Sequence, residues 1–316
     1  MSKNVTISSS NKIINFYQKR WIFFSISLII MVIGIVSLIT KGAQLDIQFK
    51  GGALLKYTYV GDLNADNAAD VVTKLLDRPV TAQTTTDLST GANRLIINIS
   101  GNYGIESELQ DKLEDELIKE FPNSKLEMEA SSMVQPFFGQ QFLRKGITAI
   151  LLSAALVMIY VWIRFNKIGG LSAGVMALVA LFHDLLVVFF TYVIFQIPIG
   201  DSFIAVALSI IGYSINDTIV IYDRIRENAT INPGLPIEKI TNLSITQSMS
   251  RSINTNIAVL ISVSMIFILA FANSIDSVQS FALPMAIGSI SGCYSTICIA
   301  GPLWVTWKKR KKAVVE

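Results

Sequence analysis

The chain has 316 residues, of which 52% are hydrophobic and only 16% are charged, against about 25% charged residues in ordinary soluble domains. This composition and the mean hydropathy of +0.52 argue against a cytosolic enzyme or a disordered chain. A net charge of +3 is too small to suggest nucleic-acid binding. Residues 41–145 hold 15 acidic and 11 basic residues, whereas the rest is apolar with basic edges. The sequence therefore predicts a polytopic α-helical membrane protein with one soluble, mildly acidic region.

Six apolar segments are long enough to cross the hydrocarbon core of a membrane, which takes about 20 residues. They cover residues 21–40, 146–163, 169–195, 202–222, 247–271 and 281–304. The first lacks the short apolar core and the small-residue cleavage site of a secretory signal, so we expect an uncleaved span.

The basic residues predict the orientation of these spans, because short cytoplasmic loops carry an excess of lysine and arginine. Lysine and arginine occur before the first span, in the second and fourth connections between membrane segments, and after the last span, whereas 196–201 and 272–279 contain none. We therefore expect a multi-pass protein of the cell (plasma or inner) membrane with both termini in the cytoplasm. The predicted domains are 1–40 (cytoplasmic N-terminus and first helix), 41–145 (extracytoplasmic), 146–307 (helices two to six) and 308–316 (cytoplasmic basic tail).

The soluble region alternates between patterns typical of strands and of helices. Strands are expected at 54–60, 81–86, 94–99 and 125–133, and helices at 65–77 and 104–121. The order β-α-β-β-α-β predicts a ferredoxin-like α+β domain between the first and second membrane helices.

Several polar residues fall inside the predicted spans, where ionisable side chains are functional by default. Asp217 lies in the inner half of the fourth span, and Arg251 opens the fifth, so the two can lie at similar depth on neighbouring helices. A carboxyl group balanced between burial and an opposite charge can bind and release a proton, which makes Asp217 and Arg251 candidates for a proton path. His183, Asp184, Tyr213 and Asn254 are secondary candidates. The alternative for every one of them is a fixed hydrogen-bonded contact between helices.

Common catalytic and cofactor motifs are absent from the sequence. It contains no phosphate-binding loop, dinucleotide fingerprint, nucleophile elbow or H-E-x-x-H motif. Cys293 and Cys298 share one apolar run and are expected to be buried hydrophobes, and with His183 as the single histidine a zinc site is nearly excluded. We expect no enzyme activity, no cofactor and no metal.

One stretch of the fourth span, Gly212 to Asn228 (GYSINDTIVIYDRIREN), resembles the SecF members of the SecD/SecF family, which are accessory subunits of the bacterial Sec translocase. Four further segments are similar to motifs of this family: Ser248 to Thr255, Leu181 to Asp184, Tyr294 to Ile297 with Ala300, Pro302 and Leu303, and Phe49 to Gly52. Gln48 and Gln135 depart from the family pattern at the two junctions of the soluble region with the membrane.

The resemblance implies a subunit that acts with SecD, in a bundle of the resistance-nodulation-division (RND) type, to complete protein export with the proton motive force. It places Asp217 and Arg251 on the proton path. It also implies contact with the SecY/SecE/SecG channel, SecA, a YidC-type insertase, the translocating preprotein and membrane lipid, but not with nucleic acid. Two alternatives remain open at this point: half of a small-molecule efflux transporter of the same type, and a scaffold that only stabilises the channel.

Overall fold

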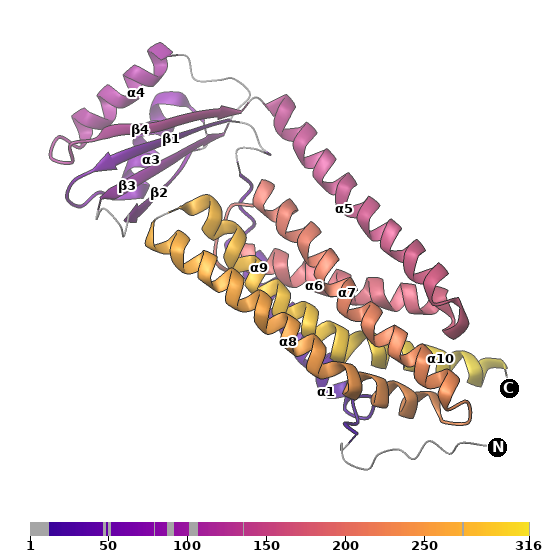
Figure 1. The fold of residues 1–316 in the computed structure, drawn as a ribbon. Coiled ribbons are helices and arrows are strands. Elements are labelled where there is room, and N and C mark those ends of the chain that lie inside the picture. The colour runs from indigo at the N-terminus through magenta and orange to yellow at the C-terminus, as the bar shows by residue number, and fades with distance from the viewer. Residues whose placement is uncertain are drawn as a thin grey trace.

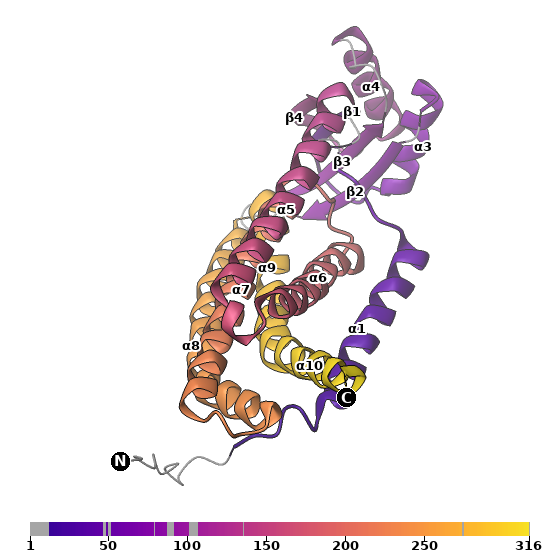
Figure 2. The same cartoon turned by 90° about the vertical axis from the view of Figure 1, so that its right-hand side faces the viewer.

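The computed structural model describes residues 13–46, 49, 52–78, 80–86, 92–100, 107–134, 136–273 and 275–315. A long bundle of helices and a small unit of sheet and helices make up this structure, with the sheet beyond one end of the bundle (Figure 1). The helix α1 begins, and α10 ends, at the end of the bundle far from the sheet (Figure 2).

The described residues contain six helical spans that are long and apolar enough to cross a membrane. Five are single helices: α1 (Arg20–Lys41), α5 (Pro136–Arg164), α6 (Gly170–Ile194), α7 (Asp201–Ile231) and α8 (Ile237–Ala272). The sixth span consists of α9 (Asp276–Ser295), a π-helical turn (Thr296–Ala300) and α10 (Gly301–Val315). Each apolar segment predicted from the sequence falls largely within one of these spans.

Three helices extend well beyond the apolar segments that predicted them. α5 begins ten residues before the predicted position 146, α7 ends nine residues after 222, and α8 begins ten residues before 247. The extensions of α7 and α8 pack against each other, since Asn228 donates to the Ser244 hydroxyl at 2.8 Å and to the Gln247 side chain at 2.9 Å. Hydropathy predicted the apolar part of each helix, whereas the polar contacts between α7 and α8 stabilise helical structure beyond that part.

The small unit contains a four-stranded antiparallel sheet with the strand order β2-β3-β1-β4. Its elements follow the chain as β1 (Gly52–Tyr59), α3 (Ala65–Leu76), β2 (Val80–Thr86), β3 (Asn93–Ser100), α4 (Ser107–Glu120) and β4 (Glu127–Val134). The Asn64 side chain caps α3 by accepting from the backbone N–H groups of Asp66 and Asn67. Alternate residues of β1 and β3 form one core with residues of α3 and α4, namely Ala53, Leu55, Tyr57, Tyr59, Leu95, Ile97, Ile99, Ala68, Val72, Leu113 and Leu117.

Two connections join this unit to the bundle. The segment after α1 forms a parallel β-bridge between Leu45 and Ile199, in the turn between α6 and α7. The Ile199 N–H donates to the Gln44 carbonyl at 2.8 Å, and the Ile199 carbonyl accepts from the Asp46 N–H at 3.0 Å. Phe49 is then buried in the bundle among residues of α6, α7, α8 and α9. At the other connection, one residue separates the end of β4 from the start of α5.

Candidate functional site

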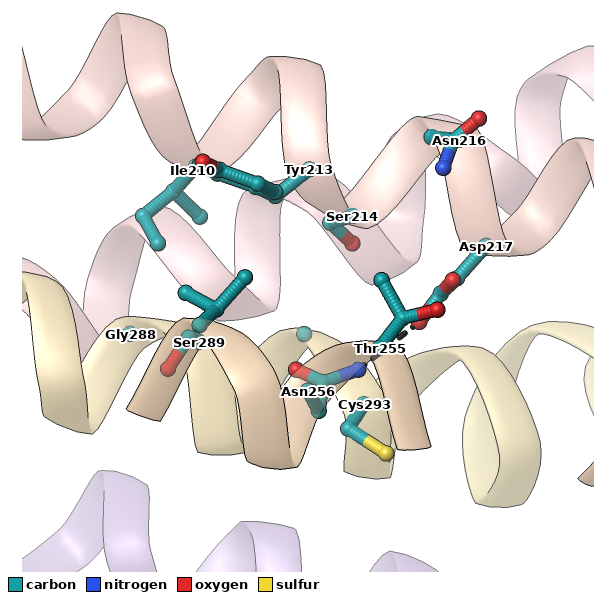
Figure 3. Close-up of a pocket in the computed structure, with 12 residues that line it drawn as sticks. Ile210, Tyr213, Ser214, Asn216, Asp217, Thr255, Asn256, Gly288, Ser289 and Cys293 are labelled. Atoms are coloured by element: carbon teal, nitrogen blue, oxygen red, sulfur yellow. Dashed lines mark hydrogen bonds between the residues drawn. The ribbon is translucent and has the colours of Figure 1, made fainter. Parts of the chain in front are cut away.

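Asp217 is buried in the middle of the bundle, with 6% of its surface exposed. Its carboxylate accepts a hydrogen bond of 2.8 Å from the side-chain amide of Asn256, which reaches across from α8 to α7 (Figure 3). The same amide group donates to the Ser252 carbonyl one turn earlier in α8, at 3.0 Å. Asn256 is thereby fixed on its own helix while it holds the carboxylate of the neighbouring one.

A small cavity adjoins Asp217 between α7, α8 and α9 (Figure 3). Its volume is about 10 Å³, which is close to the space that one water molecule needs. Polar side chains of all three helices line it, including Ser214, Asp217, Asn256 and Ser289. A water molecule here would find several hydrogen-bonding partners, as an ordered internal water requires.

Arg251 lies on α8 but makes no ion pair with Asp217 among the residues that the structure describes. Its side chain is exposed, and it borders an open polar groove of about 470 Å³ between α7 and α8. The groove is lined by Val220, Asp223, Arg224, Arg226, Glu227, Gln247, Ser248 and Arg251. Arg251 is close enough to Asp217 for a charge–charge interaction, but the direct contact belongs to Asn256.

The secondary candidates Tyr213 and Asn254 face outward from the bundle. Tyr213 is 47% exposed, although it also borders the small cavity, and Asn254 is exposed on α8. With Asn216 and Arg251 they form an exposed polar strip, which we define as Tyr213, Asn216, Arg251 and Asn254. Polar groups that face lipid on a membrane helix are costly.

Asp184 and His183 lie together on α6, and Asp184 is fully buried. Three serine hydroxyls donate to its carboxylate, each at 2.7 Å: Ser214 of α7 and Ser295 of α9 to Oδ2, and Ser291 of α9 to Oδ1. The Nδ1 atom of His183 lies 3.2 Å from Oδ1, while its buried Nε2 has no hydrogen-bonding partner in the structure. Asp184 thus connects α6, α7 and α9 through neutral donors.

The π-helical turn of the sixth span lies beside this second carboxylate. Thr296, at its start, donates to the Ser214 carbonyl at 3.3 Å, and its hydroxyl lies 3.0 Å from that of Thr218. Single π-helical turns of this kind are frequent at functional sites.

Sequence analysis did not single out Asn256 or the three serines as partners of the two acids. Ser214 and Asp217 are three residues apart on one helix face, and Ser291 and Ser295 are four apart, so helical spacing carried a usable signal. The signal is weak, because many serines in membrane helices bond only to their own backbone, as Ser209 and Ser262 do here.

Comparisons with known proteins all point in one direction. The family "Protein export membrane protein SecD/SecF, C-terminal" matches residues 114–310. The chain is 31% identical to the protein translocase subunit SecF of Petrotoga mobilis, over 95% of this chain and 97% of that one. It is 33% identical to the subunit of the same name from Alicyclobacillus acidocaldarius, over 93% of each.

Two solved structures of SecDF are similar to the fold. The first, a translocon-associated membrane protein from Thermus thermophilus, gives a TM-score of 0.77 at 26% identity, over 95% of this chain and 39% of that one. The second, SecDF in a super-membrane-facing form, gives a TM-score of 0.66 at 26% identity, over 96% and 40%. The chain therefore spans about two fifths of the length of those SecDF chains.

Proposed function

Because the chain belongs to the SecD/SecF family of protein export membrane proteins, we propose that it is a SecF-type subunit that acts with SecD and uses the proton motive force to complete protein export. The chain is a multi-pass cell membrane protein, as its six apolar helices and its SecF relatives indicate. Its relatives are named as translocase subunits, which are components of transport rather than enzymes.

The observation that carries the proposal is the buried carboxyl group of Asp217. Its direct partner is a neutral amide rather than an arginine, so a proton can arrive without the breaking of an ion pair. The polar groove further along α7 gives access to water on the side where Arg251 lies, and the water-sized cavity lies on the other side of Asp217, toward the sheet. We assign Asp217 as the proton carrier, with Arg251 as the charge that adjusts it, and His183, Asp184, Tyr213 and Asn254 as secondary members.

The exposed polar strip supports a partnership with SecD. Tyr213, Asn216, Arg251 and Asn254 would face lipid if this bundle stood alone in the membrane. A second polar bundle packed against α7 and α8 removes that cost, and the SecDF chains of known structure are long enough to contain one beyond the region matched here. We propose that SecD supplies it, in an arrangement of the RND type.

We place the unit of β1 to β4 on the outer face of the membrane, as a ferredoxin-like domain within residues 41–145. Its element order and its strand order fit a split β-α-β fold, and the basic residues lie near the opposite end of the bundle. Both termini then lie in the cytoplasm. On the outer face the domain can hold an emerging preprotein, while the bundle works beside the SecY/SecE/SecG channel, SecA and a YidC-type insertase.

A small-molecule efflux function remains the alternative. Its support is the RND-type arrangement that the family resemblance implies. The relatives' names and the single small outer unit favour protein export. An efflux subunit would change the sensitivity of cells to small toxic molecules and would leave secretion unaltered.

Preprotein translocation into inverted membrane vesicles tests the proposal. Vesicles with and without this chain are compared while a proton gradient or a sodium gradient is imposed, and ionophores that collapse each gradient serve as controls. We expect the proton gradient to accelerate completion of translocation only when the chain is present. Equal rates with and without the chain would contradict the proposal. Acceleration by the sodium gradient alone would show that sodium, and not the proton, is the coupling ion.

A further inference from the structure

The fully buried carboxylate of Asp184 has no evident role in a path that contains only Asp217 and Arg251. Asp184 takes one hydrogen bond from each of three serines, contributed by two neighbouring helices. A carboxylate has about four acceptor positions, so these hydroxyls and the adjacent His183 ring nearly saturate it. Such an arrangement fixes Asp184 as a second buried carboxylate at a defined place inside the bundle.

Ser214 connects this carboxylate to the neighbourhood of Asp217. Its hydroxyl donates to Asp184 Oδ2, and Ser214 also lines the water-sized cavity that Asp217 lines (Figure 3). Ser291 and Ser295 hold Asp184 equally well, but neither of them lines that cavity. Among the three serines, Ser214 is therefore the one that both donates to Asp184 and lines the cavity beside Asp217.

The two carboxylates lie at different depths along the bundle. Asp184 is ten residues from Ile194 at the sheet-side end of α6, which corresponds to about 15 Å of helix. Asp217 is sixteen residues from Asp201 at the sheet-side end of α7, or about 24 Å. The polar groove begins about one turn further along α7, at Val220. Groove, Asp217, cavity, Ser214 and Asp184 thus follow one another toward the sheet-side end.

The other titratable groups around this path are His183, Tyr213, Cys293, Tyr294 and Arg251, of which Tyr213 and Cys293 line the cavity. His183 packs against the Tyr294 ring with 6.1 Å between ring centroids. The Tyr294 hydroxyl donates to the Phe23 carbonyl of α1, away from both acids. Among the described residues, no hydrogen bond joins Cys293, Tyr294 or Arg251 to either carboxylate.

We propose that Asp184 and Asp217 exchange a proton through the Ser214 hydroxyl and one water molecule in the cavity. The inference rests on the proposed function, since it requires Asp217 to carry a proton. In the inward transfer, protonated Asp184 gives the proton on Oδ2 to Ser214 Oγ, Ser214 passes its own hydroxyl proton to the water, and the water gives a proton to the Asp217 carboxylate. Asp184 ends as a carboxylate and Asp217 as a neutral acid, so charge and atoms balance.

Ser214→Ala and Ser295→Ala form a matched pair for the test. Each variant removes one hydroxyl at 2.7 Å from the same oxygen of Asp184, but only Ser214 also lines the cavity. The readout is proton uptake, followed with a pH-sensitive dye, by inverted vesicles from cells that express the full chain with its native partners. We expect Ser214→Ala to slow uptake by about tenfold or more and Ser295→Ala by less than about twofold. Equal uptake in the two variants would overturn the relay.

Asp217→Asn, measured in the same vesicles, separates this proposal from the one on which it rests. If Asp217→Asn abolishes uptake while Ser214→Ala does not, the proposed function stands and the relay is wrong. If neither variant changes uptake, both are wrong. Infrared spectroscopy provides a second measurement that does not depend on Ser214→Ala folding. Titration of the unaltered protein is expected to show one carboxylic-acid band that disappears in Asp184→Asn and another that disappears in Asp217→Asn, and the absence of the first would overturn the proposal.

Discussion

At the scale of single residues, both acids in the bundle are held by neutral donors. Asp217 accepts a hydrogen bond from the side-chain amide of Asn256, and Asp184 accepts one from each of three serine hydroxyls. Neutral donors satisfy a carboxylate without cancelling its charge. Each site therefore carries a full negative charge when the carboxylate is ionised and no net charge when it is protonated, and inside a bundle that change acts more strongly on neighbouring groups than it would in water.

Asp217→Asn is expected to insert and assemble normally but to lose gradient-dependent stimulation of export. The substitution keeps the size of the side chain and its hydrogen-bonding capacity but removes the group that titrates. Glu238→Gln is the matched control, because Glu238 lies on the neighbouring helix α8, lines neither the groove nor the cavity, and pairs with Lys309. Preprotein translocation under a full proton gradient measures both variants. Normal export by Asp217→Asn would show that the carboxyl group is structural.

The contact between Asn256 and Asp217 predicts that replacing Asn256 lowers the stability of the protein more than replacing Asn254, which lies on the same helix. Asn256→Ala leaves the buried carboxylate without its donor, so we expect a loss of about 1–3 kcal/mol of stability. Asn254→Ala changes an exposed side chain of the isolated chain and is expected to stay within about 0.5 kcal/mol. Thermal unfolding of the purified chain in detergent compares the two, and equal losses would contradict the assignment.

Sequence reasoning identified Asp217 but not its direct partner, and the reason is geometric. A charged residue in an apolar segment is visible from composition alone, whereas its partner depends on how the neighbouring helix is rotated about its axis. Arg251 and Asn256 are five residues apart, which corresponds to about 140° around α8. α8 presents Asn256 to α7 and leaves Arg251 exposed at the groove.

At the scale of elements, the membrane helices pack closely where glycine removes the side chain. A Cβ atom on Gly170, at the start of α6, would lie 2.1 Å from the Trp162 carbonyl oxygen of α5. A Cβ atom on Gly174, one turn later, would lie 3.4 Å from the Met158 carbonyl oxygen, at the edge of ordinary contact. The two helices therefore approach most closely where α5 ends.

These two glycines predict opposite outcomes for the same substitution. Gly170→Ala forces two backbones apart and is expected to destabilise the protein by about 1–3 kcal/mol. Gly174→Ala has room and replaces a poor helix former, so its stability should stay within about 0.5 kcal/mol or rise. Thermal unfolding in detergent distinguishes them. If both variants were equally stable, the close approach of α5 and α6 would be wrong.

The elements themselves were predictable to different degrees. Alternation predicted the four strands to within about two residues of where they lie, because each strand has one face in the core of the small unit. The composite sixth span was not predicted, since Thr296 to Ala300 read as an ordinary apolar helix. A π-helical turn depends on contacts such as those of Thr296 with Ser214 and Thr218, which single-sequence periodicity does not reveal.

At the scale of the whole molecule, the sheet and the exposed polar hairpin of α7 and α8 lie at opposite ends of the bundle (Figures 1 and 2). The proposed orientation puts the first outside the cell and the second in the cytoplasm. Asp70 on α3 and Lys239 on α8 are exposed residues that represent these two ends.

Cysteine labelling of intact cells or spheroplasts tests that orientation. In a variant without Cys293 and Cys298, Asp70→Cys should react with a membrane-impermeant maleimide at once. Lys239→Cys, as the matched control, should react only after permeabilisation. The reverse pattern would invert the topology and would remove the outer unit from any contact with an emerging preprotein.

The straight course of α5 has a mechanical consequence. Its end near Trp162 is held against α6 at Gly170, and sixteen residues earlier Gly146 lies against Ile204 of α7. With the first contact as a fulcrum, the lever arm is about 24 Å to Gly146 and about 39 Å to Pro136, where α5 begins beside the sheet. A sideways shift of α7 at Ile204 is then magnified about 1.6-fold at the edge of the sheet. A movement of the helix that carries Asp217 is thus enlarged before it reaches the small unit.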